Sequence, residues 1–164
     1  MQDVDFAIRW DRMTDSNKRS LLMQLPMPLF PVCSPQLLTR HDFPATNGTL
    51  DVTELTGSGL AATPLLCEDR ALDLWQTWYG IQARPLANPR RTIADANVRT
   101  QAAIDGQGWT LADALMQREL DSGALVAPFG HQLDGYGYVI QTSPGRFVSQ
   151  NALALRKWLI DHDS

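Results

Sequence analysis

The clearest pattern of apolar and polar positions lies in residues 97–111, with the sequence NVRTQAAIDGQGWTL. Its first half predicts a helix with one small apolar face, because apolar residues recur there at helical spacing; these are Val98, Ala102 and Ala103. Asp95 or Asn97 can cap the start, since a short side-chain oxygen accepts hydrogen bonds from the free N–H groups of a first helical turn. The polar start of the helix, which also holds Arg99 and Thr100, is predicted to point toward one edge of a sheet.

Two glycines end this helix and lead into a strand. Gly106 is predicted to adopt a positive φ at the helix end, and Gly108 lets the chain turn at once into the strand residues 109–111. A helix that leads directly into a strand is half of a crossover connection, so the sheet is predicted to be parallel or mixed. Open sheets of this kind commonly bind small ligands at an edge.

The rest of the chain alternates between strand and helix patterns. Strands are predicted at residues 4–10, 27–33, 63–66, 91–94, 124–127 and 136–142. Helices are predicted at residues 35–38, 71–79, 112–122 and 151–161, the last capped by Ser149, with a single helical turn at 51–55. This alternation indicates an α/β fold.

Two of the predicted strands contain prolines. Pro28 and Pro31 interrupt the first, and Pro128 interrupts the segment 125–129. Proline lacks a backbone N–H, so it belongs at sheet edges or where a strand leaves one sheet for another. We interpret the two segments as crossovers that join two lobes with a cleft between them. One lobe with two edge strands is the alternative.

Composition narrows the class of protein. The chain has 164 residues, 44% hydrophobic and 20% charged, which is typical of a globular protein. Its net charge of -4 argues against a broad nucleic-acid-binding face, and the group Arg84, Arg90 and Arg91 is interpreted as a solvated rim. The sequence shows neither a signal peptide nor a membrane span, so a cytoplasmic location is predicted. Cys33 and Cys67 are predicted to be reduced thiols.

Motifs for catalysis or cofactor binding are missing from the sequence. The three histidines, His41, His131 and His162, lack the spacing of metal ligands. Neither a dinucleotide fingerprint nor a nucleophile elbow is present. We therefore predict that the protein is not an enzyme and holds neither a metal nor a cofactor.

Six segments together resemble a known family. They are DVDFAIRW (3–10), PLFPVCSPQLL (28–38), TPLLCEDRALDLWQTWYG (63–80), QAAIDGQGWTLAD (101–113), ELDSGALVAPFG (119–130) and YGYVIQTSP (136–144), the last followed by a terminal helix with Trp158. In this order they resemble the effector-binding domain of LysR-type transcriptional regulators, in the branch that includes the glycine-cleavage activator.

The resemblance implies a fold like the type II periplasmic binding proteins, in which two α/β lobes hold a small effector in their cleft. Lobe I would comprise residues 1–30 and 130–164, and lobe II residues 31–129. The implied function is an effector-sensing and dimerisation domain of a transcription regulator. The alternatives are a free-standing small-molecule-binding protein and a degenerate truncated regulator without a ligand. A hydrolase or lyase on this fold would need a polar catalytic cluster in the cleft.

The chain departs from the family at its start. Nothing in it resembles the N-terminal winged helix-turn-helix or its linker helix, and residues 7–10 correspond to the third strand of lobe I. We therefore expect a truncated chain with an incomplete lobe I, which would reach DNA only through a missing N-terminal domain. An unpaired sheet edge beside Val4, Phe6 and Ile8 would then favour a dimer or larger homo-oligomer.

The segments that match the family's cleft supply the candidate effector-binding residues. They are the loop after the third strand, the loop after a strand of lobe II and the start of the 97–104 helix, which contribute Trp10, Asp11, Cys67, Glu68, Asp95 and Asn97. Because the charged members are acidic, a zwitterionic or amine-bearing effector, such as an amino acid or another small polar compound, fits better than an anion. Asp95 as a simple cap and Trp10 as a core residue remain open alternatives. The sequence names neither the effector, nor the target genes, nor the direction of regulation.

Overall fold

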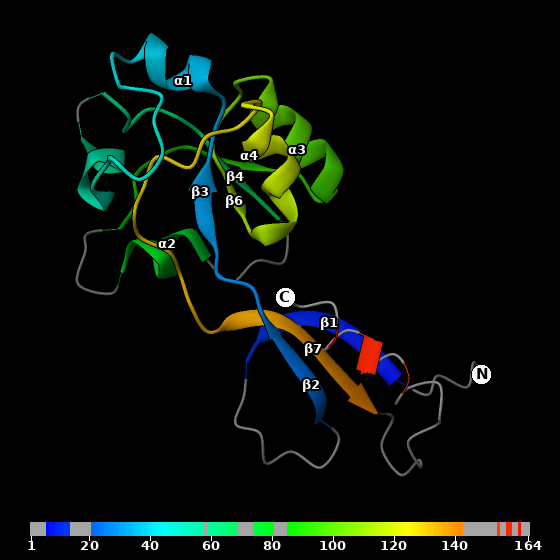
Figure 1. The fold of residues 1–164 in the computed structure, drawn as a ribbon. Helices are drawn as coiled ribbons and strands as arrows, with labels where there is room; N and C mark the ends of the chain where they lie inside the picture. Colours follow the sequence, from blue (N-terminus) through cyan, green and yellow to red (C-terminus); the bar gives the residue numbers. More distant parts are fainter. Residues whose placement is uncertain are drawn as a thin grey trace. The chain divides into compact units, whose positions relative to one another are not determined.

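The computed structural model describes residues 6–13, 21–57, 59–68, 74–80 and 85–142, together with residues 154, 157, 158 and 161 (Figure 1). The chain divides into two compact units. Unit 1 comprises Met1–Pro28 and Asp134–Ser164, and unit 2 is the continuous segment Leu29–Leu133. The predicted final helix at 151–161 and its cap at Ser149 lie largely outside the described residues.

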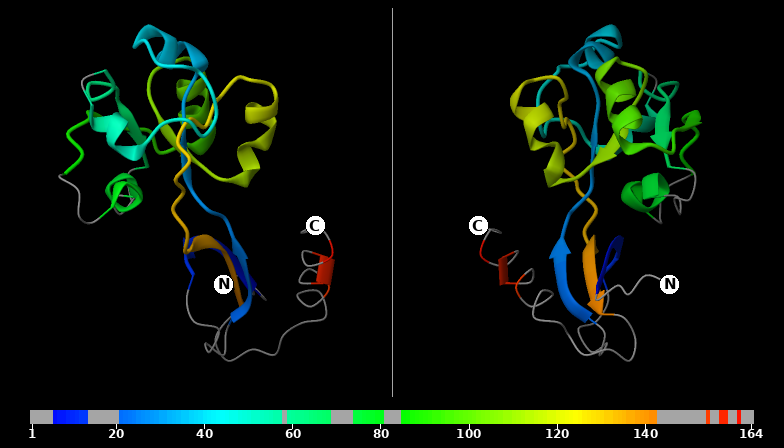
Figure 2. Two further views of the ribbon diagram at one scale, coloured as in Figure 1. Left: turned by 60° about the vertical axis from the view of Figure 1, so that its left-hand side comes forward. Right: turned by 90° about the vertical axis from the view of Figure 1, so that its right-hand side faces the viewer.

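Unit 1 contains a three-stranded antiparallel sheet. The strand β7 (Tyr136–Thr142) lies between β1 (Phe6–Arg12) and β2 (Leu21–Pro26), as Figure 2 shows. Buried side chains of Val139 and Ile140 in β7 contribute to its core. The structure corrects one prediction, because β1 continues to Arg12 rather than ending at residue 10. It also adds β2, a strand that was not predicted from the sequence.

Unit 2 contains a mixed sheet, as predicted from the 97–111 pattern. The strand β4 (Leu65–Cys67) pairs in parallel with β5 (Arg90–Thr92), and β3 (Phe30–Val32) pairs antiparallel with β6 (Thr110–Ala112). A parallel bridge between Leu65 and Trp109 joins the two pairs. In place of the strand predicted at 124–127, the structure has a single bridge between Val126 and Cys33.

Short helices connect these strands. In unit 2 they are α1 (Pro35–Arg40), η1 (Val52–Thr56), α2 (Leu74–Tyr79), α3 (Ala96–Ile104), η2 (Ala114–Met116) and α4 (Gln117–Asp121). Side chains cap the starts of two of them, Ser34 at α1 and Asp51 at η1. Hydrogen bonds from the backbone N–H and the hydroxyl of Thr53 lower the pKa of Asp51. The helix predicted at 112–122 is instead the end of β6, a 3₁₀ turn and α4. The first three residues of the helix predicted at 71–79 lie outside the described residues.

The core of unit 2 has two parts. Leucine and aromatic side chains form most of the first, where Trp78 meets Phe129 edge-on with ring centroids 5.1 Å apart. In the second, Ala102 and Ala103 of α3 pack with buried residues of β3, β4 and β6. Val98 is 56% exposed, so its predicted place on the apolar face is wrong: α3 contacts the sheet only through its later turns.

The two cysteines are free thiols, as predicted. Cys33 is fully buried, and burial raises the pKa of its thiol far above the usual range. Cys67 is half-buried at the end of β4. Among the described residues, none of the helices has the length and apolar character needed to cross a membrane.

Candidate functional site

The carboxyl ends of β4 and β5 meet at one edge of the unit 2 sheet. Cys67 lies opposite Thr92 in the parallel register, and the N–H of Ile93 donates a 2.8 Å hydrogen bond to the Cys67 carbonyl. Glu68 follows at once and is exposed. This arrangement places the chain after β4 beside the chain after β5, at the kind of strand end where open α/β sheets bind ligands.

The chain after β5 enters α3 through a side-chain cap. Oδ1 of Asp95 accepts hydrogen bonds from the backbone N–H groups of Asn97, at 2.8 Å, and Val98, at 3.0 Å. The alternative interpretation of Asp95 as a cap is therefore correct for this oxygen. The first-turn N–H groups of a helix otherwise attract anions, and here the carboxylate of the chain itself occupies two of them. Both Asp95 and Asn97 are exposed.

The guanidinium of Arg99 also holds the segment between β5 and α3, through hydrogen bonds to its backbone carbonyls. Nη1 of Arg99 donates to the carbonyl of Ile93 at 2.7 Å and to that of Ala94 at 3.2 Å. Sequence reasoning placed Arg99 at the helix start but gave it no role. The sequence does contain one electrostatic indication of this role. A cation near a helix N-terminus is disfavoured by the helix dipole, so Arg99 must be stabilised by other partners.

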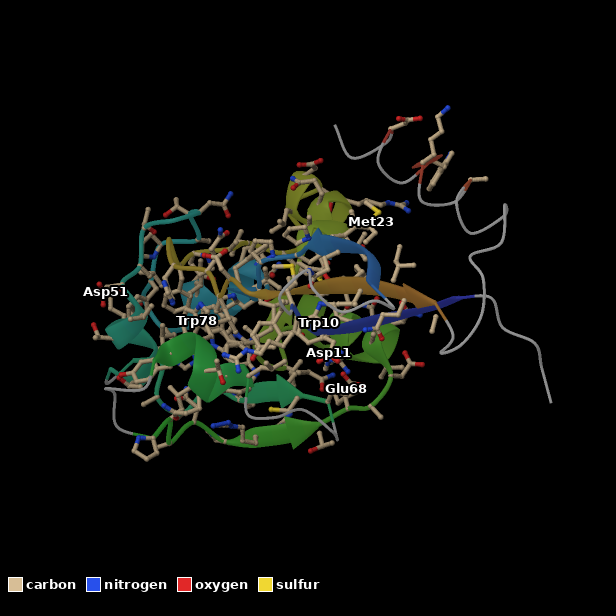
Figure 3. All side chains as sticks on the ribbon, turned by 90° about the horizontal axis from the view of Figure 1, so that it is seen from below. Trp10, Asp11, Met23, Asp51, Glu68 and Trp78 are labelled. Carbon is tan, nitrogen blue, oxygen red and sulfur yellow. The ribbon has the colours of Figure 1, made fainter. Side chains whose placement is uncertain are left out.

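Trp10 and Asp11 belong to unit 1, and both lie within β1 rather than in a loop after it (Figure 3). The indole of Trp10 stacks on the ring of Tyr136, with centroids 5.2 Å apart and planes inclined by 11°. Trp10 is half-buried, so it contributes to packing in its own sheet. Asp11 is exposed, and its Oδ1 accepts a 2.7 Å hydrogen bond from the Arg12 N–H.

The six predicted residues thus divide between the two units. Cys67, Glu68, Asp95 and Asn97 gather at one sheet edge of unit 2, which we call the β4–β5 edge. Within the described part of the chain, no group of three or more His, Cys, Asp or Glu side chains is arranged to hold a metal ion.

His131 forms hydrogen bonds and a ring contact with Trp78 that have a structural role. Its Nε2 lies 3.0 Å from the carbonyl of Trp78, while the indole N–H of Trp78 donates to the His131 carbonyl at 3.1 Å. The imidazole also lies against the Trp78 ring, with centroids 5.7 Å apart. These reciprocal bonds hold the end of α2 against residues 129–131.

Comparison with known families gives one match, which covers the whole chain. Residues 1–164 match the family described as the LysR substrate binding domain. None of the curated proteins matches the chain.

Several solved structures are similar to the chain. The effector domain of the transcriptional regulator AmpR of Pseudomonas aeruginosa is 24% identical, with a TM-score of 0.70, over 98% of this chain and 72% of that one. The AmpR effector-binding domain from Citrobacter freundii is 21% identical, with a TM-score of 0.69, over 98% and 74% of the two chains. Full-length LysG from Corynebacterium glutamicum with bound effector Arg is 18% identical, with a TM-score of 0.65, over 95% and 50%. At these identities the likeness shows the fold, which is the predicted type II periplasmic-binding-protein-like α/β fold.

Proposed function

Because the chain belongs to the LysR substrate-binding domain family, we propose that it senses a small amine-bearing or zwitterionic effector at the β4–β5 edge. The family is regulatory rather than catalytic, and LysR regulators are cytoplasmic, in agreement with the sequence predictions. Contact with DNA would require a separate DNA-binding domain. The single observation that carries the proposed ligand class is the charge at this edge.

Two exposed carboxylates, those of Glu68 and Asp95, follow the ends of the two parallel strands. Oδ1 of Asp95 already accepts hydrogen bonds from the N–H groups of Asn97 and Val98, two of the donors that an anionic ligand would use. An ammonium group on the ligand would instead be attracted by both carboxylates. The LysG relative is described with arginine, an amine-bearing molecule, as its bound effector, and this supports the same class.

A thermal-shift panel tests this proposal. We expect amino acids and other amines to raise the melting temperature, whereas carboxylates that lack an amine do not. A ligand at about 100 times its Kd stabilises the folded state by about 2.7 kcal/mol. Glu68→Gln should weaken the response, because it removes charge and keeps shape. Asp105→Asn, at the opposite end of α3, is the matched control and should leave the response unchanged.

Stabilisation by simple carboxylates, or an unchanged response in Glu68→Gln, would contradict the proposed ligand class. A wild-type chain that responds to no compound would favour the degenerate regulator without a ligand.

We further propose that units 1 and 2 correspond to lobes I and II, with the boundaries at residues 30 and 130 that the resemblance implies. On this assignment Trp10 and Asp11, the other two candidate effector-binding residues, would belong to lobe I. The branch of the glycine-cleavage activator remains our proposal from the six matching segments. Its test is the identity of the compound that gives the largest thermal shift.

We also propose that the chain forms a homo-oligomer through the outer edge of β1. Within the described residues, the only strand that pairs with β1 is β7. Unpaired strand edges favour pairing with another copy of the chain, and a charged side chain on such an edge opposes it. We expect light scattering to show a dimer or larger species, and Ala7→Lys, at an exposed position of β1, to shift it toward the monomer. A monomeric wild-type chain would contradict this proposal.

A further inference from the structure

We propose that Arg99 is the positioning residue of the β4–β5 edge, and that it holds the loop 93–95, which leads into α3, in the conformation that binds effector. The inference rests on the proposed function, because this loop carries Asp95 and leads directly to Asn97 in the first turn of α3. It assigns to Arg99 a role that acts through the loop backbone, without direct contact with the ligand.

The geometry of the Arg99 side chain carries the inference. One nitrogen, Nη1, donates to two successive carbonyls, those of Ile93 at 2.7 Å and Ala94 at 3.2 Å, and the first of these bonds is partly buried. A guanidinium has a planar, fixed arrangement of donors, whereas a lysine ammonium is a point charge on a flexible stem. Two carbonyls held by one rigid group define the backbone course immediately before Asp95.

The two hydrogen bonds from Arg99 are part of a set that holds both ends of the loop. The Ile93 N–H is bound to the Cys67 carbonyl, which ties the loop to the end of β4. On the far side, Asp95 caps the N–H groups of Asn97 and Val98. Arg99 connects the two ends, so its loss would leave two carbonyls without their side-chain donor and give the loop more freedom. An ordered loop binds more tightly, because the ligand then does not have to order it.

The positioning role of Arg99 can be distinguished from the effect of its charge, because the two change the affinity for an amine in opposite directions. A guanidinium near the edge repels an ammonium, so Arg99→Met, acting through charge alone, would strengthen binding of an amine. Loss of positioning acts in the opposite direction. Arg99→Lys keeps the charge, but its ammonium ends one bond short of the Nη1 position and lies on a flexible stem, so it holds the two carbonyls less well and separates the two effects.

The first measurement uses the ligand-free chain. Hydrogen exchange of the backbone amides is followed in wild type, Arg99→Met and Arg99→Lys, with Arg118→Met in α4 as the control. We expect the amides of Ile93, Asn97 and Val98 to exchange at least about tenfold faster in Arg99→Met, less so in Arg99→Lys, and unchanged in the control. The urea midpoint should stay close to that of wild type. Unchanged exchange at these three amides would overturn the proposal.

The second measurement is the affinity for L-arginine, used as the amine-bearing probe. Both Arg99 variants should raise its Kd by about tenfold, which corresponds to about 1.4 kcal/mol. Binding by Arg99→Met that is as tight as wild type, or tighter, would overturn the positioning role. If wild type binds neither L-arginine nor the rest of the amino-acid panel, the proposed function fails, and the exchange measurement alone decides the role of Arg99.

Discussion

Replacing Trp109 with alanine is expected to lower the free energy of unfolding by about 3–5 kcal/mol. The side chain is fully buried, and its ring lies 5.4 Å from that of Phe129. Its indole N–H donates a 2.9 Å hydrogen bond to the hydroxyl of Thr63, and its backbone bridges to β4 at Leu65. The substitution therefore creates a cavity at the point where β4 and β6 meet. Urea denaturation followed by circular dichroism measures the loss.

Two further variants serve as comparisons for the stability of Trp109→Ala. Trp109→Phe keeps an aromatic ring and removes the hydrogen bond to Thr63, so its cost should be clearly smaller. Leu115→Ala, at a side chain that is 66% exposed, should change stability by no more than about 0.5 kcal/mol. If Trp109→Ala cost no more than Leu115→Ala, Trp109 would not be a core residue of unit 2.

The part of the fold that was predicted from sequence is the part that local chemistry determines. The cap at Asp95, the helix that follows it and the positive φ of 79° at Gly106 all depend on residues close together in the chain. The mixed sheet was also predictable, because a helix that runs directly into a strand restricts how strands pair.

The remaining features depend on contacts between distant residues. The strand at 21–26 is recognisable only from its pairing with β7, more than a hundred residues later in the chain. Val98 has helical spacing relative to Ala102, but it is exposed, and only the later residues of α3 pack into the core. Asp11 was expected in a loop, whereas pairing with Gly137 extends β1 through it to Arg12.

The candidate site divides in the same way. The resemblance to the family's cleft segments selected Cys67, Glu68 and the start of α3, and the structure brings these residues to the carboxyl ends of two parallel strands. The role of Arg99 was not predictable, because it depends on the direction of two backbone carbonyls. A sequence shows which side chains can donate hydrogen bonds, but not where a loop turns its acceptors.

Gly137→Ala is expected to destabilise unit 1 by at least about 1–3 kcal/mol, the usual cost of forcing extra atoms into a packed site. Gly137 is buried in β7, and a Cβ there would collide with the backbone carbonyl of Leu25 and lie 3.0 Å from the N of Met27. Both obstacles are backbone atoms, so a side-chain rotation cannot relieve the contact. Relief would require β2 to move away from β7, at the expense of the 2.9 Å hydrogen bond from the Met27 N–H to the Tyr136 carbonyl.

The neighbouring glycine separates steric contact from backbone strain. Gly135 has a φ of 91° and open space where a Cβ would lie, so Gly135→Ala carries only the strain of an unfavourable φ, about 1 kcal/mol or more. Hydrogen exchange should accelerate at Val139 and Ile140 much more in Gly137→Ala than in Gly135→Ala. Equal acceleration in both variants would contradict the steric account.

The amides around Trp109 report on unit 2 in the same experiment. If they stay protected from exchange while β7 opens, the two units unfold separately. Trp109→Ala and Gly137→Ala then act on different cooperative transitions.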